Sequence, residues 1–198
     1  MIPEAIQKFI AAFSKLPSLG PRLTTRLAFY LTDLPKNDLR ELESALGSLK
    51  NFGRCKQCFF LSMNGDLCGI CSNPKRDKSI IAIVEKETDL ISIEKTGNFG
   101  GQYLVLGRLG DLNALETAQK LKLEHLKKRI ANEPHGKIKE LIIALNPNAT
   151  GDYVAQVIAE DFKNLAERIT RLGRGIPTGG EIEFADEETL NQALKRRG

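Results

Sequence analysis

The chain has 198 residues, 41% of them hydrophobic and 27% charged, and its 29 Lys/Arg and 25 Asp/Glu give a net charge of +4. This length suits one large domain or two to three small modules. No apolar run approaches the roughly 20 residues that cross a bilayer, and the start, Met1-Ile2-Pro3-Glu4, does not resemble a secretion signal. We therefore expect a cytoplasmic protein, and the mild charge alone does not indicate a nucleic-acid partner.

Three helices are predicted in the N-terminal segment. Apolar residues recur with helical spacing from Ile6 to Leu16, between Pro3 and Pro17, and further helices start at Pro21 and after Pro35. The leucines of the second and third helices are expected to face inward: Leu23, Leu27, Leu31, Leu39, Leu42, Leu46 and Leu49.

The turn at residues 16–22 is a candidate phosphate site. Backbone N–H groups around Leu19 and Gly20, and at the start of the following helix, should point outward at the positive end of the helix dipole. Arg22 and Arg26 lie four residues apart and share a helix face. The pattern predicts sequence-nonspecific DNA binding by these four residues. An ordinary αα-hairpin with a solvated basic face is the alternative that the pattern leaves open.

The four cysteines, Cys55, Cys58, Cys68 and Cys71, have the spacing C-x2-C-x9-C-x2-C. Each C-x2-C pair presents two thiolates from one tight turn, and two such turns complete a tetrahedron around Zn2+. Buried or redox-active thiols are the alternative, but clustering in an intracellular chain favours a metal. We predict one structural zinc per chain, because four protein ligands leave no open position for water.

Strands and helices alternate in the rest of the chain, which predicts a mainly parallel sheet with helices on both faces. The expected strands are residues 80–84, 102–106, 140–145 and 168–172; the expected helices are 88–95, 115–130 and 153–162. A Gly-rich segment at 173–180 and a basic helix at 189–197 follow.

Acidic side chains follow the ends of two predicted strands. Glu85 comes directly after the strand that ends at Val84, Asp89 is four residues further, and Asp152 follows the strand at 140–145. Ligands of open α/β sheets bind at the carboxyl ends of the strands, so Glu85 and Asp152 are expected to approach one another. A Mg2+ site for phosphoryl transfer needs several hard oxygen ligands, and Thr150 stands where a further carboxylate would help. Helix caps, ion pairs or a protein-docking surface are therefore favoured over catalysis.

Read together, four segments resemble the RecR family of bacterial recombination mediators, over nearly the whole chain. They are residues 16–22 with 26–31, the four cysteines, residues 83–85 with Asp89 and 100–107, and residues 170–186 with Thr189-Leu190.

The resemblance implies an α+β protein of several modules. They are a helix-hairpin-helix DNA-binding region at 1–53, a four-cysteine zinc ribbon (zinc finger) at 54–74, a Toprim α/β domain with a mainly parallel sheet at 79–172, and a C-terminal Gly-rich segment with a short helix at 173–198.

It also implies a non-catalytic DNA repair protein. Such a protein forms a homodimer or tetrameric ring, binds or encircles DNA and, with the partners RecO and in some lineages RecF, loads the RecA recombinase. Arg22 and Arg26 match family positions associated with DNA contact. Glu85 and Asp152, with Asp89 nearby, match the Toprim acidic cluster linked to the partner protein.

The chain departs from the family pattern at three places. Ser18 stands where the hairpin usually has Gly, and Thr150-Gly151-Asp152 stands where an acidic-Gly-acidic triplet is usual. The segment at residues 108–112 also lacks the usual Gly- and Pro-containing loop. The alternatives are a protein-binding zinc scaffold and a Toprim-type metal-dependent DNA enzyme, primase-like or nuclease-like. Such an enzyme needs the missing carboxylate and, for topoisomerase chemistry, a tyrosine nucleophile, whereas the three tyrosines, Tyr30, Tyr103 and Tyr153, fall on positions expected in the core.

Overall fold

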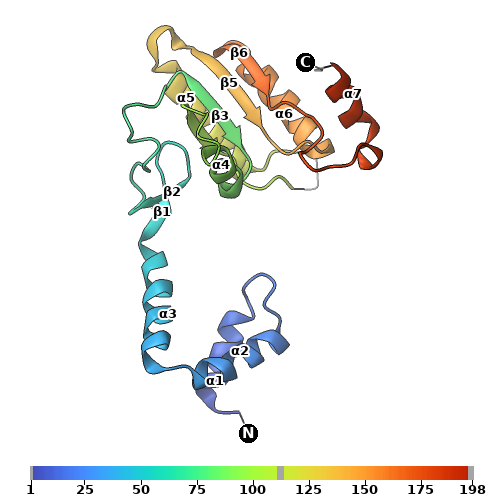
Figure 1. The fold of residues 1–198 in the computed structure, drawn as a ribbon. Coiled ribbons are helices and arrows are strands. Elements are labelled where there is room, and N and C mark those ends of the chain that lie inside the picture. Colours follow the sequence, from blue (N-terminus) through green and yellow to red (C-terminus); the bar gives the residue numbers. More distant parts are fainter. Residues whose placement is uncertain (1, 111–113, 196–198) are drawn as a thin grey trace. The chain divides into compact units, whose positions relative to one another are not determined.

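The computed structural model describes residues 2–110 and 114–195. The chain separates into two compact units, Met1–Asn51 and Phe52–Gly198 (Figure 1). The first is helical; the second holds the cysteines and a four-stranded sheet. The predicted α+β class is confirmed.

The first unit consists of helices separated by proline-containing turns. They are α1 (Glu4–Phe13), α2 (Pro21–Asp33), α3 (Lys36–Ser48) and the 3-10 turn η1 (Leu49–Asn51). Pro21 is the first residue of α2 and Pro35 caps α3, as expected for a residue whose fixed φ suits the start of a helix. α1 ends earlier than predicted, because residues 14–16 form a tight turn in which Leu16 N–H donates to the Phe13 carbonyl at 3.0 Å.

This unit buries few of its apolar side chains. Among its described residues only Thr24 and Ala28 are fully buried, while Leu27 and Leu31 are half-buried. The prediction of an inward face was wrong for Leu23 and for the four leucines of α3 and η1, which are 43–63% exposed. Helical periodicity identifies an apolar face, but it does not say whether the chain supplies a layer to cover it.

The sheet of the second unit has the strand order β4-β3-β5-β6, and all neighbouring strands are parallel. Its strands are β3 (Ile80–Val84), β4 (Gln102–Val105), β5 (Ile138–Ala144) and β6 (Ala166–Arg171). β3 has the predicted bounds, because its run of apolar, mostly β-branched residues is unbroken; the other strands differ from the prediction only at their ends. The chain leaves β3 toward β4 and later returns to β5, so the topological switch point lies between β3 and β5.

Helices cover both faces of this sheet, as predicted. Their bounds are α4 (Glu87–Glu94), α5 (Thr117–Ala131) and α6 (Ala149–Phe162), with the 3-10 turn η2 (Pro134–Gly136) after α5. Residues of α5 and α6 pack with Ile81 and Ile83, whereas Leu90 of α4 packs with Ala82 and Val84 on the opposite face. The alternation follows from the two-residue period of a strand.

The cysteine module packs directly on this sheet. It contains an antiparallel hairpin of β1 (Phe52–Arg54) and β2 (Leu61–Met63). Val105 N–H, at the end of the outer strand β4, donates to the Cys58 carbonyl at 2.8 Å. Phe59 packs against the core on the α5 side, and Phe60 against the core on the α4 side. The module is therefore continuous with the sheet domain.

The C-terminal segment contains η3 (Ile182–Phe184) and α7 (Glu187–Lys195). The predicted basic helix thus begins earlier than expected, and the end predicted for it lies outside the described residues. None of the helices in the described ranges is both long and apolar enough to cross a bilayer.

Candidate metal centre, nucleic-acid interface and acidic edge

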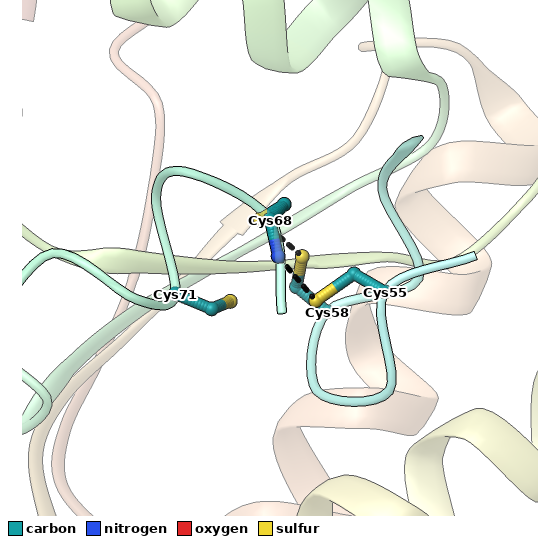
Figure 2. A group of neighbouring side chains, drawn as sticks. All are labelled: Cys55, Cys58, Cys68 and Cys71. Atoms are coloured by element: carbon teal, nitrogen blue, oxygen red, sulfur yellow. Dashed lines mark hydrogen bonds between the residues drawn. The ribbon is translucent and has the colours of Figure 1, made fainter. Parts of the chain in front are cut away.

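The four cysteine side chains converge from two turns, as Figure 2 shows. Their sulfur atoms all lie within 4.8 Å of one another, and all four residues are buried. Cys58 Sγ and Cys68 Sγ are 3.5 Å apart, and the cysteines are free thiols without a disulfide. Zn–S bonds of about 2.3 Å in a tetrahedron place neighbouring sulfurs just under about 4 Å apart. The donor set therefore fits a zinc-sized ion.

The thiols differ in how readily they ionise. Burial opposes ionisation of Cys55, but backbone hydrogen bonds from residues 58, 68 and 57 outweigh it and lower the pKa of Cys55 to about 7. One of these bonds is Cys68 N–H to Cys55 Sγ, at 3.3 Å. Burial raises the pKa of Cys68 to about 11, and a hydrogen bond with Cys71 together with burial raises the pKa of Cys58 further. A cation is the counterpart that would hold these buried thiols as thiolates.

The N-terminal turn has a strained residue at its centre. Ser18 has φ 65°, in the left-handed region that favours glycine. Gly20 is the N-cap of α2, and its carbonyl accepts both the N–H and the hydroxyl of Thr24, each at 3.0 Å. Ser14 Oγ also reaches Thr24 Oγ1 at 3.3 Å, so this hydroxyl ties α1 to α2.

The expectation of an outward N–H at Leu19 was wrong. This group donates to the Leu16 carbonyl at 3.2 Å and closes the turn. In the described part of the chain, the N–H groups of Gly20, Arg22 and Leu23 have no hydrogen-bond partner. The available donors thus lie at the N-cap and first turn of α2, where they were expected, without Leu19.

Arg22 and Arg26 are both exposed on α2. No ion pair or hydrogen bond within the described ranges engages either guanidinium. They lie one helical turn apart and next to the free N–H groups at the start of α2. The arrangement presents positive charge and backbone donors together, which suits a phosphate group.

Glu85 lies at the switch point of the sheet. It is buried, with 7% of its surface exposed. Its Oε2 accepts from Asn146 Nδ2 at 2.6 Å, and its Oε1 lies 3.4 Å from Leu109 N. Glu85 follows β3 and Asn146 follows β5, so this bond bridges the crevice where ligands of open α/β sheets commonly bind.

The other two acidic residues have different neighbours. Asp89 Oδ2 accepts from Lys86 N–H at 2.9 Å and so caps α4. Asp152 forms ion pairs with Arg171 and Arg174. Burial alone would raise the pKa of Asp152, but the two guanidinium groups hold it below its usual range.

The three acids therefore do not gather as a metal site. Asp89 and Asp152 line a pocket of about 740 Å³ at the carboxyl ends of β5 and β6, whereas Glu85 lines a different pocket of about 380 Å³. Among the residues that the structure describes, only the four cysteines form a group of three or more possible metal ligands.

The tyrosines divide between core and surface. Tyr103 is fully buried, and its hydroxyl donates to Glu94 Oε1 at 2.6 Å; burial and this carboxylate raise its pKa. Tyr30 and Tyr153 are 62% and 48% exposed, so the prediction that they belong to the core was wrong. Both lie on the exposed faces of amphipathic helices. Periodicity alone did not show whether a tyrosine lies on the exposed or the buried face.

Sequence reasoning missed the cations around these sites. Arg171 and Arg174, which neutralise Asp152, lie at the end of β6 and in the Gly-rich segment. Arg76 pairs with Glu94 and donates to the Phe99 carbonyl at 2.8 Å, which fixes the segment after the cysteines against α4. These pairs join residues far apart in the chain, and no local signal indicates them.

Known proteins of one family are similar to this chain along its whole length. A family model described as the Toprim domain matches residues 79–173, and one described as RecR, C-terminal, matches residues 175–197. Recombination protein RecR of Chloroflexus aurantiacus is 39% identical, covering 100% of this chain and 95% of its own length. The corresponding proteins of Roseiflexus castenholzii and Rubrobacter xylanophilus are each 40% identical, over 100% and 98% of this chain and 95% and 96% of their own lengths. The chain therefore belongs to the RecR family of recombination proteins.

Proposed function

We propose that this protein is a cytoplasmic, non-catalytic recombination mediator that holds DNA through Arg22, Arg26 and the backbone at Gly20. The observation that carries the proposal is the pair of exposed arginines, unpaired within the described ranges, beside the free N–H groups at the start of α2. Leu19 contributes to this surface through the turn that it closes, while its N–H is already used. Contacts of this kind reach phosphates and carry no direct sequence information.

One hairpin makes few phosphate contacts, so a single protomer should bind weakly. A homo-oligomer, dimer or tetrameric ring, would place several hairpins on one DNA and raise the effective concentration of each. The exposed leucines of α3 supply apolar surface in the same unit. In the proposed role, RecO, joined in some lineages by RecF, docks at the edge that carries Glu85, Asp89 and Asp152, and RecA is loaded onto the DNA.

Catalysis is not part of the proposal. Glu85 is engaged by Asn146 and Asp152 by two arginines, and Thr150 replaces a carboxylate of the acidic triplet. A two-metal or one-metal phosphoryl-transfer site requires carboxylates that converge on the ion. The cysteines, in the same proposal, hold one structural Zn2+ that stabilises the fold.

The deciding experiment is DNA binding by the double variant Arg22→Ala/Arg26→Ala, measured by fluorescence anisotropy over a range of salt concentrations. The matched control is Lys36→Ala/Arg40→Ala, which removes the same charge from exposed positions four apart on α3. The first variant should bind more weakly on unrelated sequences, with a salt slope lower by roughly 0.7–0.9 for each phosphate that is no longer neutralised. Equal binding by the two variants would refute the interface.

Absence of catalysis is tested separately, by incubating the protein with supercoiled and single-stranded DNA and Mg2+. We expect no cleavage, joining or synthesis. Any of these activities that copurifies with the protein and is lost in Glu85→Gln would overturn this part of the proposal and favour the Toprim-enzyme alternative.

A further inference from the structure

Arg129 of α5 is a half-buried cation with an incomplete set of partners. Its Nη2 donates to Gln102 Oε1, but its Nε and Nη1 are buried without any hydrogen-bond partner in the described structure. Gln102, the first residue of β4, is fully buried, and its Nε2 also lacks a partner among the described residues. Unpaired buried charges are strongly unfavourable, so two unused guanidinium donors indicate that a further negative group belongs beside them.

The cysteine cluster is a candidate for this group, because α5 borders it. Lys122 Nζ lies 5.3 Å from the centre of the Phe59 ring, and the His125 ring packs edge-on against the same ring at 5.3 Å. Phe59 directly follows Cys58. Arg129 follows Lys122 and His125 at helical spacing and therefore lies on the same face of α5.

β4 borders the cluster from a second side. Val105 of this strand donates to the Cys58 carbonyl, and Gln102 of the same strand holds the Arg129 guanidinium. Burial lowers the pKa of Arg129, while the thiols of Cys71, Cys58 and Cys55, together with Glu133, act against that shift. Three of the four cysteines thus lie within electrostatic range of the Arg129 guanidinium.

The net charge of a metal-loaded cluster explains why a cation should lie beside it. Four thiolates around one divalent cation leave two negative charges in a buried site, and groups outside the ligand set then stabilise the ligands. The backbone N–H of Cys68 is one such donor, toward Cys55 Sγ. The two unused nitrogen atoms of Arg129, Nε and Nη1, supply both further donors and an opposing charge.

We propose that Arg129, positioned by Gln102, is the counter-charge of the four-cysteine metal centre. The inference rests on the metal site proposed above and extends it from the cysteine module into α5 and the sheet. With metal bound, the guanidinium faces a net negative centre. With neutral thiols and no metal, only Gln102 and Glu133 offset its burial, so metal binding and the packing of α5 are coupled.

The test compares Arg129→Met with Lys128→Met, the same substitution at an exposed neighbour on α5. Zn2+ affinity is measured by competition with a chromophoric chelator, and the Co2+-loaded protein is examined for its thiolate-to-metal charge-transfer band. Arg129→Met should bind Zn2+ roughly 10–100-fold more weakly and shift the band, as loss of an outer-shell partner does. Lys128→Met should match the wild type in both measurements.

Melting with and without chelator separates this role from a purely structural one. Arg129→Met should melt lower than the wild type with zinc, but as high as the wild type or higher without it. A residue that acts only as packing would lower both melting temperatures alike. If Arg129→Met does not fold, Arg129→Gln is used instead, because it keeps N–H donors and removes the charge. A weaker Zn2+ affinity of this variant would then support the role of Arg129.

The outcomes also separate this inference from the metal site itself. A wild-type protein that binds neither Zn2+ nor Co2+ would overturn both proposals. A wild type that binds tightly, with an Arg129→Met or Arg129→Gln variant of unchanged affinity and an unchanged Co2+ band, would overturn the role of Arg129 and leave the metal site standing.

Discussion

The two units of the chain differ sharply in how much apolar surface they bury. Phe52–Gly198 has a sheet with packed cores on both faces, and residues such as Leu126 and Ile83 are completely buried. In the described part of Met1–Asn51 only Thr24 and Ala28 reach full burial. Small units bury a smaller share of their surface in any case. The difference teaches that the second unit carries its own stability, whereas the first has a marginal core and an uncovered apolar face.

Among these predictions, removing a cysteine should cause the largest loss of stability, and this loss should fall on the second unit. Structural zinc sites in small peptides contribute on the order of 10–16 kcal/mol, so Cys58→Ala should destabilise Phe52–Gly198 by several kcal/mol. Metal content and unfolding followed by circular dichroism measure the effect. Met63→Ala, at an exposed position of the same hairpin, is the control. A Cys58→Ala protein with full metal content and unchanged melting would contradict the assignment.

The same substitution in the two units tests the comparison directly. Leu126→Ala, in the core beneath α5, should cost about 2–5 kcal/mol through reduced burial and a cavity. Leu46→Ala, on the exposed face of α3, should cost no more than about 0.5 kcal/mol at low protein concentration. Chemical denaturation measures both. Comparable losses of stability would mean that the α3 face is covered in solution, and a loss at Leu46 that grows with concentration would identify self-association.

Two helical glycines provide a smaller contrast. A Cβ at Gly151 in α6 would stand 2.0 Å from the Asn146 carbonyl oxygen, so Gly151→Ala should cost about 1–3 kcal/mol. Gly47 in α3 has no neighbour within 4 Å of that position, and Gly47→Ala should stabilise by about 0.5–1 kcal/mol. Thermal melting decides, and a stabilising Gly151→Ala would show that α6 can move away from residue 146 at little cost.

The smallest expected effect lies in the N-terminal turn. Ser18→Gly removes the penalty of a left-handed non-glycine residue and should stabilise the first unit by up to about 1 kcal/mol. Asn64→Gly, at φ 53° in the second unit, should gain less, because asparagine tolerates this region better. Equal melting of Ser18→Gly and the wild type would argue that the turn relaxes in solution.

Local patterns predicted the fold well because local physics determines the elements concerned. The mostly β-branched run at Ile80–Val84 is buried on both faces and forms β3 with the expected bounds. Pro21 and Pro35 indicated where α2 and α3 start, because the fixed φ of proline suits the start of a helix and its missing N–H is not needed there. The cysteine spacing likewise predicted a convergent donor set, because each pair lies within one turn.

The partners of the acidic residues were beyond sequence reasoning. Asn146 meets Glu85 only because β3 and β5 are adjacent and in a particular register. The contacts of Asp152 with Arg171 and Arg174 depend on how the end of β6 lies beside α6. Arg129 and Gln102 are likewise separated along the chain and meet only through tertiary packing. The charge and periodicity of a segment indicate the helix or strand that it forms, but not which other helix or strand packs against it.

The bond from Val105 N–H to the Cys58 carbonyl has a consequence for solubility. β4 is an outer strand, and its free edge would otherwise offer unpaired backbone groups to the strands of other molecules. The cysteine turn pairs with that edge at its last residue, Val105. Loss of the turn would thus open the end of a short, fully buried strand as a template for intermolecular pairing. We expect protein deprived of metal to be lost from solution by aggregation before its sheet unfolds.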